Sequence, residues 1–357
     1  MSNTKSCCLM ILLLVFGPLA CVGCSDTSEK KASLSEPITV TERVGKGRVI
    51  QEAPSDSGKE PYIQGSKQKQ DLEDTQPAIE KVGNFLTPTE YFSIPSRHFS
   101  EAICAVSLPQ DYNNDPTRKY PLVVAFGGAG ECMRSPRQGA LAWVHYYRAD
   151  EAANALSSQN LKSSDFRGLV NKDQLEKFNR SLQTSPYKGV VLVCPYSPVL
   201  GMQPGLEFPE YEKYVMDELI PALCKHYRID PSGIGVDGVS MGGARSMYYG
   251  FKYPEVFKRI GSVQAAVGPF METYRLLINS NHDQISKCSI QIVSSDGDIF
   301  LKSVDAFSSM LNSLRLPHSL LILTGPHDYI FNQGPGSLAL LAFHGLPTPK
   351  TPQGPVR

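Results

Sequence analysis

The stretch Gly238-Val239-Ser240-Met241-Gly242-Gly243 follows a short apolar run at 233–237 and precedes a helical pattern at 242–253. A Gly-x-Ser-x-Gly turn between a strand and a helix holds its serine in a strained conformation, because side chains at the two glycine positions would collide with neighbouring backbone. The serine hydroxyl then stands exposed at a helix N-terminus. We therefore predict that Ser240 is a nucleophile; a chance Gly-rich turn is the alternative.

Short apolar runs recur on both sides of this turn. They predict strands at 102–108, 121–126, 189–194, 233–237, 259–264, 289–294 and 319–323. Residues 211–227, 242–253 and 302–314 carry apolar side chains at helical spacing. Most of the strand runs are too apolar for a sheet with one face in water. The sequence therefore predicts an α/β fold with a mostly parallel central sheet and helices on both faces.

A nucleophilic serine needs a histidine base, and that base needs an acid to fix its tautomer. Four histidines follow Ser240, and of these only His327, in Gly325-Pro326-His327-Asp328, lies in a loop directly after a predicted strand. His318 precedes that strand, His282 lies in a polar connection, and His344 lies in an apolar segment where a packed or surface role is expected. We predict that His327 is the base.

The acid should follow the strand predicted at 289–294. Asp296 and Asp298 both occupy that loop, in Ser295-Asp296-Gly297-Asp298, and position alone leaves both open. Turn chemistry is the alternative use of such a pair, since Asp-Gly favours tight turns.

A tetrahedral intermediate also needs donors aimed at its oxyanion. The backbone N–H of Met241, directly after the nucleophile, is one predicted donor. The loop Gly127-Gly128-Ala129-Gly130 follows the strand predicted at 121–126, and Gly128 is the second predicted donor. A phosphate-binding loop is the weaker interpretation, because the Lys-Ser/Thr ending of a P-loop is missing.

Five segments carry a family resemblance: Ala105-Val106-Ser107-Leu108-Pro109, Lys119-Tyr120-Pro121-Leu122-Val123-Val124, Asp217-Glu218-Leu219-Ile220-Pro221, Ser240-Met241-Gly242-Gly243 and Tyr253-Pro254-Glu255-Val256-Phe257. Together they resemble the esterase family of the α/β-hydrolase superfamily, which includes esterase D-like, enterochelin esterase-like and feruloyl or acetyl-xylan esterase-like enzymes. The resemblance runs from Tyr91 to Phe343. It implies an α/β-hydrolase fold and a serine carboxylic-ester hydrolase that works through an acyl-enzyme, without a cofactor.

The family's acid loop typically reads Gly-x-x-Asp followed soon by Phe, which implies that Asp298, ahead of Phe300, is the acid and Asp296 the reserve. Its histidine loop matches residues 325–328. Two departures stand out. The usual His-Gly of the oxyanion loop is Phe126-Gly127 here, and the segment 132–187 is longer and more polar than expected, so it is expected to form a cap or lid.

Three functions are compatible with this sequence. A hydrolase releases the acyl group to water, an acyltransferase with the same triad passes it to another acceptor, and a non-catalytic surface binding protein would keep only the fold. The expected partner of an enzyme is a small-molecule or glycan-linked ester. The aromatic residues Trp143, Tyr146 and Tyr147 are expected to pack in the core or lid rather than to stack on substrate.

Charge and cysteine content narrow the partners. The chain has 35 basic and 35 acidic residues among 357, so no basic surface argues for nucleic acid. No His/Cys spacing indicates a metal site. Of nine cysteines, four lie near the N-terminus and five follow: Cys104, Cys132, Cys194, Cys224 and Cys288. Cys194 and Cys224 are expected to be buried free thiols.

The N-terminus reads as an export signal over residues 1–24, with Lys5 ahead of an apolar run at 9–19 that is too short to span a bilayer. Cys21-Val22-Gly23-Cys24 resembles a bacterial lipobox, and Cys24 is the preferred lipidation site over Cys21. A polar, disordered tether is expected at 25–87, a catalytic domain at 88–350 and a short tail at 351–357. These segments predict an envelope lipoprotein that contacts the membrane only through its lipid; simple secretion is the alternative.

Overall fold

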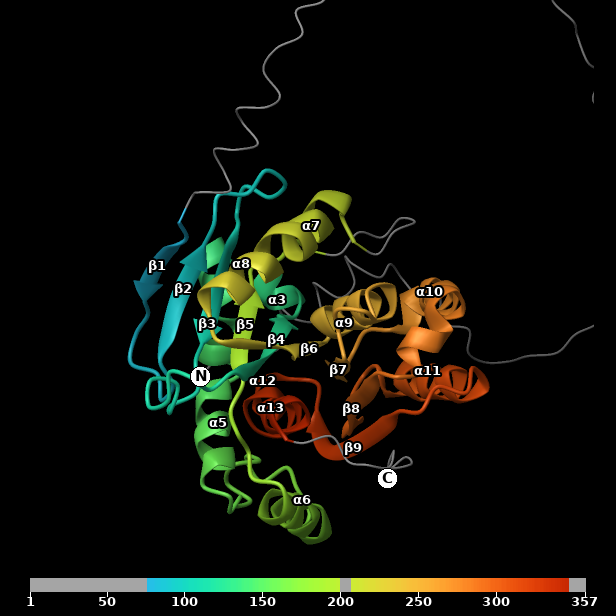
Figure 1. The fold of residues 1–357 in the computed structure, drawn as a ribbon. Helices are drawn as coiled ribbons and strands as arrows, with labels where there is room; N and C mark the ends of the chain where they lie inside the picture. Colours follow the sequence, from blue (N-terminus) through green and yellow to red (C-terminus); the bar gives the residue numbers. More distant parts are fainter. Residues whose placement is uncertain (1–75, 200–206, 347–357) are drawn as a thin grey trace, which may run out of the picture. The chain divides into compact units, whose positions relative to one another are not determined.

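A mixed β-sheet forms the centre of the computed structural model, which describes residues 76–199 and 207–346. Within these residues it has nine strands: β1 (Ala78–Lys81), β2 (Thr89–Ser93), β3 (Ile103–Ser107), β4 (Tyr120–Phe126), β5 (Val191–Pro195), β6 (Ile229–Gly238), β7 (Arg259–Val263), β8 (Ser289–Gly297) and β9 (Ser319–Pro326). All seven strands predicted from apolar runs are present. Their order in the sheet is β1-β2-β3-β5-β4-β6-β7-β8-β9 (Figure 1).

The direction of the strands divides the sheet into two parts. β1, β2, β3 and β5 pair antiparallel in that order, whereas every pairing from β5 through β4 to β9 is parallel. Parallel strands end at the same edge, so the loops after β4, β6, β8 and β9 meet at one edge of the sheet. These are the four loops in which the sequence places the candidate site residues.

Helices cover both faces, as predicted. One layer contains α7 (Pro209–Lys213), η2 (Tyr214–Leu219), α8 (Ile220–His226), α9 (Met241–Lys252), α10 (Met271–Ile285) and α11 (Leu301–Ser313). The other contains η1 (Ala142–Tyr146), α5 (Ala149–Ser157), α6 (Lys172–Thr184) and α13 (Ser337–Gly345). Shorter turns are α3 (Ala129–Cys132), α4 (Pro136–Ala140), η3 (Gly268–Phe270), α12 (Tyr329–Phe331) and η4 (Asn332–Gly336).

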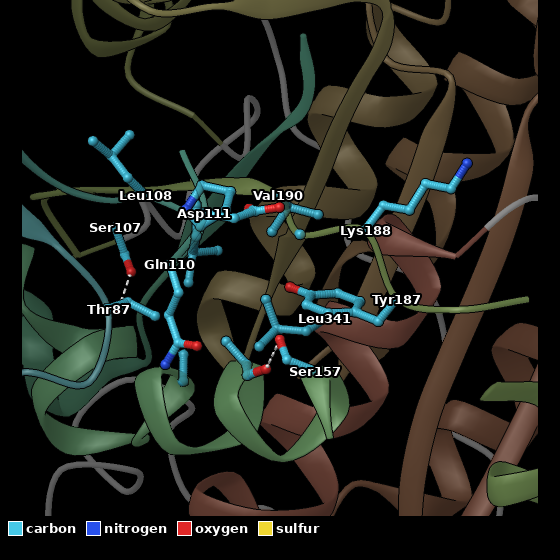
Figure 2. A pocket seen from close by; sticks show the side chains of 15 residues that line it. Thr87, Ser107, Leu108, Gln110, Asp111, Ser157, Tyr187, Lys188, Val190 and Leu341 are labelled. Carbon is cyan, nitrogen blue, oxygen red and sulfur yellow. Dashed lines mark hydrogen bonds between the residues drawn. The ribbon is translucent and has the colours of Figure 1, made fainter. Parts of the chain in front are cut away.

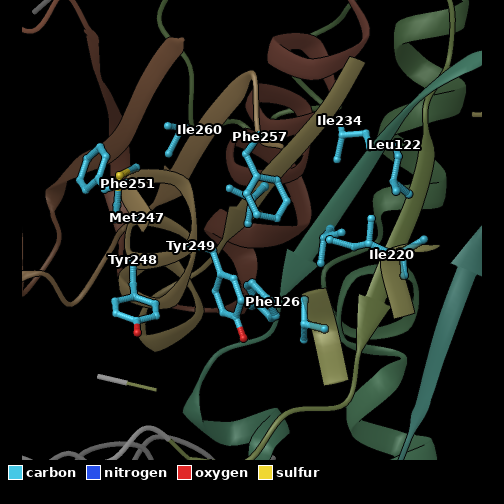
Figure 3. Packing of buried hydrophobic residues seen from close by; sticks show 14 of the residues in the cluster. Leu122, Phe126, Ile220, Ile234, Met247, Tyr248, Tyr249, Phe251, Phe257 and Ile260 are labelled. Carbon is cyan, nitrogen blue, oxygen red and sulfur yellow. The ribbon is translucent and has the colours of Figure 1, made fainter. Parts of the chain in front are cut away.

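Alternate side chains of the central strands pack into two hydrophobic cores, one on each face of the sheet. In β4, Val124 and Phe126 pack into the core under α9, while Val123 and Ala125 pack into the core under α13. Figure 3 shows the first of these cores, where Tyr249 of α9 stacks beside Phe126 with ring centroids 5.3 Å apart. Burial of both faces explains why these strands read as continuous apolar runs.

The segment 132–187 does not form the separate cap expected from its length and polarity. Trp143, Leu156 and Phe166 are fully buried, and they share the core under α13 with strand residues Val123 and Ala125. The polar residues of this segment lie on its outer side, where α6 is mostly exposed. The polar residues that suggested a lid therefore lie on the solvent-exposed face of helices that pack against the sheet.

The boundary of the predicted tether is also wrong at its C-terminal end. Residues 78–81 form β1 and pair antiparallel with residues 90–93 of β2. All four side chains of β1 are exposed, so the strand is held by backbone hydrogen bonds and has no apolar run to reveal it. The signal segment 1–24, Cys24, the tether as far as residue 75 and the tail 351–357 lie outside the described residues.

The five cysteines of the described residues are free thiols. Cys194 is buried as predicted, but Cys224 is exposed, because it lies on the outer side of α8. Burial raises the pKa of the Cys194 thiol to about 12. Among residues 76–199 and 207–346, no helix is long and apolar enough to cross a membrane.

Candidate active site

The turn between β6 and α9 holds Ser240 in a strained backbone conformation, with φ 57° and ψ −117°. Two backbone hydrogen bonds fix it from the end of β7 and the loop that follows: the Ser240 N–H donates to Val263 O at 2.9 Å, and Ser240 O accepts from the Ala266 N–H at 3.0 Å. Such a conformation persists only where the surrounding structure holds it. The predicted sharp turn is present, with Ser240 at its tip.

The two glycines of the motif are required by close backbone contacts. A Cβ on Gly238 would lie 2.2 Å from Gly242 O, and one on Gly242 would lie 2.4 Å from both Phe126 O and Gly127 O. Carbonyl oxygens cannot yield at such distances without moving the turn or β4. The glycines therefore let the turn pack directly on the end of β4 and the loop that follows it.

The structure brings Ser240, His327 and Asp298 together from three loops. His327 Nε2 lies 3.2 Å from Ser240 Oγ, and His327 Nδ1 lies 2.8 Å from Asp298 Oδ1. Because an ionised carboxylate only accepts hydrogen bonds, Nδ1 carries the proton and Nε2 is left to accept from the serine hydroxyl. This is the geometry in which an imidazole can take a proton from a serine.

Asp298 is fixed by donors other than His327. Its Oδ1 also accepts from the Phe300 N–H at 2.9 Å, and its Oδ2 accepts from Ser294 Oγ at 2.6 Å. The Asp298 side chain is fully buried, whereas the His327 side chain is 16% exposed. The Phe300 ring meets the His327 ring edge to face, with centroids 5.1 Å apart. These contacts hold the carboxylate and imidazole in one orientation.

The neighbouring acid, Asp296, has a different partner. Its Oδ1 accepts from the Gly325 N–H at 3.0 Å, which joins the ends of β8 and β9. The two candidates that position alone could not separate thus differ in their contacts, and only Asp298 contacts His327 in the described chain.

The other histidines that follow Ser240 lie elsewhere. His318 contacts Ser308 Oγ, and His282 contacts Leu314 O. His344 is buried, with its Nε2 3.1 Å from Asp237 Oδ2 under the nucleophile turn. It is the packed rather than the surface histidine.

The two predicted oxyanion donors occupy the expected loops. Met241 begins α9 directly after Ser240, and Gly128 lies in the loop after β4. A Cβ on Gly128 would lie 3.8 Å from Ser240 Cβ, so the two loops adjoin. The Gly128 N–H donates to the Tyr147 hydroxyl at 3.1 Å, a contact that the sequence does not predict.

Several residues around the site escaped sequence reasoning. Ser294 donates to Asp298, and Gln264 joins the ends of β8 and β9, since its Nε2 donates to Ser295 Oγ at 2.7 Å and to Pro326 O at 2.9 Å. Glu131, Tyr147 and Tyr329 form a buried cluster beside Gly128. Ser294 lies in the run that leads to the acid, which is the one signal that could have found it.

A cavity of about 250 Å³ lies away from this site. Its lining includes Leu108, Gln110, Tyr187, Val190 and Leu341 (Figure 2). Residues 188–190 directly precede β5, so the cavity opens at the edge where the parallel strands begin. Ser240 stands at the opposite edge, where they end. The hollow in Figure 2 is therefore separate from the triad.

Within residues 76–199 and 207–346, no group of three His, Cys, Asp or Glu side chains is placed to hold a metal ion.

The comparisons with known proteins agree with this architecture. A family model described as "Putative esterase" matches residues 100–284. No curated protein matches the chain. An S-formylglutathione hydrolase from Agrobacterium tumefaciens is 19% identical, with a TM-score of 0.50, and the match covers 76% of this chain and 99% of that chain.

Two further solved structures are similar at lower scores. A ferulic acid esterase is 16% identical, with a TM-score of 0.49 and coverage of 76% of this chain and 98% of that chain. The feruloyl esterase module from Clostridium thermocellum is 13% identical, with a TM-score of 0.47 and coverage of 75% and 96%. With a matched family model over more than half of its length and the sheet of an α/β-hydrolase, the chain belongs to the "Putative esterase" family and is a serine carboxylic-ester hydrolase.

Proposed function

We propose that this protein is an exported esterase that cleaves small-molecule or glycan-linked carboxylic esters through an acyl-enzyme on Ser240. The observation that carries the catalytic part is the chain of contacts from Asp298 through His327 to Ser240, at 2.8 and 3.2 Å. Ser240 is the proposed nucleophile, His327 the general base and Asp298 the residue that orients the imidazole.

In the proposed first step, Ser240 Oγ attacks the ester carbonyl carbon while His327 Nε2 accepts the hydroxyl proton. Asp298 accepts a hydrogen bond from Nδ1 and stabilises the positive charge that develops on the ring. The carbonyl oxygen becomes an oxyanion, for which the Met241 and Gly128 N–H groups are the proposed donors. A charged oxyanion is a stronger acceptor than the neutral Tyr147 hydroxyl that the Gly128 N–H contacts at 3.1 Å.

In the proposed second half, the tetrahedral intermediate collapses and the imidazolium gives its proton to the leaving alcohol. The acyl group remains as an ester of Ser240. Water, deprotonated by His327, then attacks this ester and releases the acid. The same imidazole serves twice, once for each tetrahedral intermediate.

The first experiment measures hydrolysis of p-nitrophenyl acetate by the protein and by Ser240→Ala. We expect kcat to fall by about 10⁴-fold or more in the variant, since removing a triad serine leaves only binding and oxyanion stabilisation. Mass spectrometry of enzyme quenched during turnover should show a mass increase of one acyl group on the peptide that contains Ser240. Full activity in Ser240→Ala would refute the catalytic assignment.

Export is supported by the N-terminal sequence, in which an apolar run at 9–19 leads to Cys24. The test expresses the full chain in a bacterium fed labelled palmitate, beside Cys24→Ser and Cys21→Ser. We expect label in the parent protein and in Cys21→Ser, but not in Cys24→Ser. Unlabelled protein in the medium would instead indicate simple secretion, and protein retained in the cytoplasm would refute export.

A further inference from the structure

A buried carboxylate lies between the loop after β4 and the loop that carries His327. Glu131 is 3% exposed and follows Gly128 by three residues. Its Oε1 accepts from the Tyr329 hydroxyl at 2.6 Å, and its Oε2 accepts from the Tyr147 hydroxyl. Arg134 Nε lies 4.0 Å from Oε1. Two hydroxyl donors and a nearby guanidinium are the compensation that a buried carboxylate requires.

The Tyr147 end of this network contacts the Gly128 loop, which lies beside Ser240. Tyr147 Oη accepts from the Gly128 N–H at 3.1 Å, so the hydroxyl sets the direction of a peptide group in a loop of three glycines. The position that a Cβ on Gly128 would take is 3.3 Å from Tyr147 Oη and 3.8 Å from Ser240 Cβ. A movement of Tyr147 would therefore move the Gly128 peptide beside Ser240.

The Tyr329 end of the network lies next to the loop that carries His327. Tyr329 follows His327 by two residues and begins the short helix α12. Its ring also packs against Tyr147, with centroids 5.9 Å apart. Burial and the Glu131 charge raise the pKa of both tyrosine hydroxyls, which keeps them protonated and able to donate. Gly128, Tyr147, Glu131 and Tyr329 thus form one continuous chain of hydrogen bonds.

We propose that Glu131 is a positioning residue, which holds the oxyanion loop and the histidine loop in register through Tyr147 and Tyr329. The two loops follow strands that are separated in the sheet by β6, β7 and β8, so no strand pairing sets their relative position. The proposed reaction needs both at once, since the oxyanion donor at Gly128 and the base at His327 must meet one carbonyl group. A shift of about 1 Å in such an arrangement can cost up to a hundredfold in rate. This inference rests on the proposed function of Ser240 and His327.

The experiment compares Glu131→Gln, Glu131→Ala, Tyr147→Phe and Tyr329→Phe in p-nitrophenyl acetate hydrolysis. We expect Glu131→Ala to lower kcat by about tenfold to a hundredfold with KM within about threefold, because the network acts on geometry rather than on substrate binding. Glu131→Gln keeps one carbonyl acceptor and should recover part of the loss. A double variant that carries both Tyr147→Phe and Tyr329→Phe is also measured. Since Glu131 and the two tyrosines act as one unit, its loss of kcat should be no larger than that of Glu131→Ala.

Two matched variants control for general damage. Tyr146→Phe removes a neighbouring hydroxyl but keeps the ring that lies under Arg134 and beside Tyr329, and Glu151→Gln changes a partly exposed glutamate paired with Arg148 and Arg167. Both should keep the parent kcat. The rate at which a fluorophosphonate labels Ser240 should fall in the network variants in proportion to kcat, while the melting temperature shows whether each variant is folded.

Three outcomes would overturn the inference. Unchanged kcat in folded Glu131→Ala would mean that the network is structural only. A rise in kcat in Tyr147→Phe would mean that the hydroxyl hinders the Gly128 N–H as an oxyanion donor and does not position it. A change in KM alone would place Glu131 in substrate binding. Failure of the proposed function is distinguishable, because Ser240→Ala would then hydrolyse the ester like the parent protein.

Discussion

Two aspartates in one loop have different tasks because of where their oxygens point. Asp298 contacts His327 at 2.8 Å, and Asp296 contacts the Gly325 N–H at 3.0 Å. One contact aligns the proposed base, and the other joins two loop backbones. Asparagine at each position keeps the shape and one acceptor oxygen but removes the charge, so the pair is a natural test.

We predict that Asp298→Asn lowers kcat for p-nitrophenyl acetate by about 10³–10⁴-fold, because an amide favours the wrong imidazole tautomer and cannot stabilise the ring's charge. Asp296→Asn should stay within about threefold of the parent, since its carbonyl oxygen can still accept from Gly325. The measurement is steady-state kinetics on the two purified variants. Equal losses would contradict the assignment of Asp298.

The buried His344 should make the stability of the protein depend on pH. Burial lowers the pKa of His344 below its ordinary value of 6.5, the charge of Arg259 adds to this, and the contact with Asp237 opposes it. The unfolded chain therefore takes up the proton before the folded protein does as the pH falls. Stability that His344 contributes above pH 6.5 should be lost progressively below it.

We expect the melting temperature of the parent protein to fall more steeply than that of His344→Gln between pH 7 and pH 5. Burial raises the pKa of the Asp237 carboxyl and the contact with His344 opposes this, so in His344→Gln that pKa rises further; proton uptake by the folded variant at Asp237 as the pH falls adds to the same difference. Thermal unfolding of both proteins at half-unit pH steps measures it. Parallel curves would show that His344 is protonated alike in the folded and unfolded chain.

At the scale of elements, the sequence predicts best where burial is uniform. The seven strands that the apolar runs predict are all found, and the central strands β4, β5 and β7 are almost wholly buried. The apolar runs do not predict β2 (TEYFS), because Thr89, Glu90 and Ser93 flank its two buried aromatic residues. They also do not predict β1, whose four side chains face solvent, or α13 (SLALLAFHG), which is apolar on all sides and so shows no helical period. Periodicity reports a contrast between two faces, and neither β1 nor α13 has that contrast.

The residues of the candidate site could be predicted where they lie next to an apolar run, and not where they depend on contacts between distant segments. Ser240, His327 and the two aspartates could be located because each lies in a loop directly after an apolar strand. The Gly128–Tyr147 and Glu131–Tyr329 contacts join residues that are 19 and 198 positions apart, and no local pattern marks them. Such pairings depend on how loops and helices pack in three dimensions.

At the scale of the whole molecule, the first described residues are part of the fold. Leu86 N donates to Asp150 Oδ2 at 3.1 Å, and Thr87 Oγ1 contacts Ser107 Oγ at 2.7 Å. Asp150 is 1% exposed, so the Leu86 N–H helps to satisfy a buried carboxylate at the start of α5. The segment 76–88 thus anchors the antiparallel side of the sheet.

We predict that a chain that begins at residue 89 is less stable than one that begins at residue 76. Loss of the Leu86 N–H alone should cost roughly 1–3 kcal/mol, because the Asp150 carboxylate stays buried with one donor fewer. Urea unfolding of the two shortened proteins measures the difference. Equal stability would show that β1 and its connection contribute nothing.

The buried contact between Asp237 and His344 also limits which residues homologous proteins can carry at the neighbouring positions. A Cβ on Gly261 would lie 1.9 Å from Asp237 Oδ2, and a Cβ on Gly235 would lie 2.4 Å from His344 Nδ1. The two glycines leave room for the acid and the histidine, so a side chain can be added at position 261 or 235 only where the facing side chain becomes smaller. Among homologues, an alanine at position 261 should coincide with loss of the carboxylate at 237. This correlated exchange would mark the lineages that share the polar pair beneath the nucleophile turn.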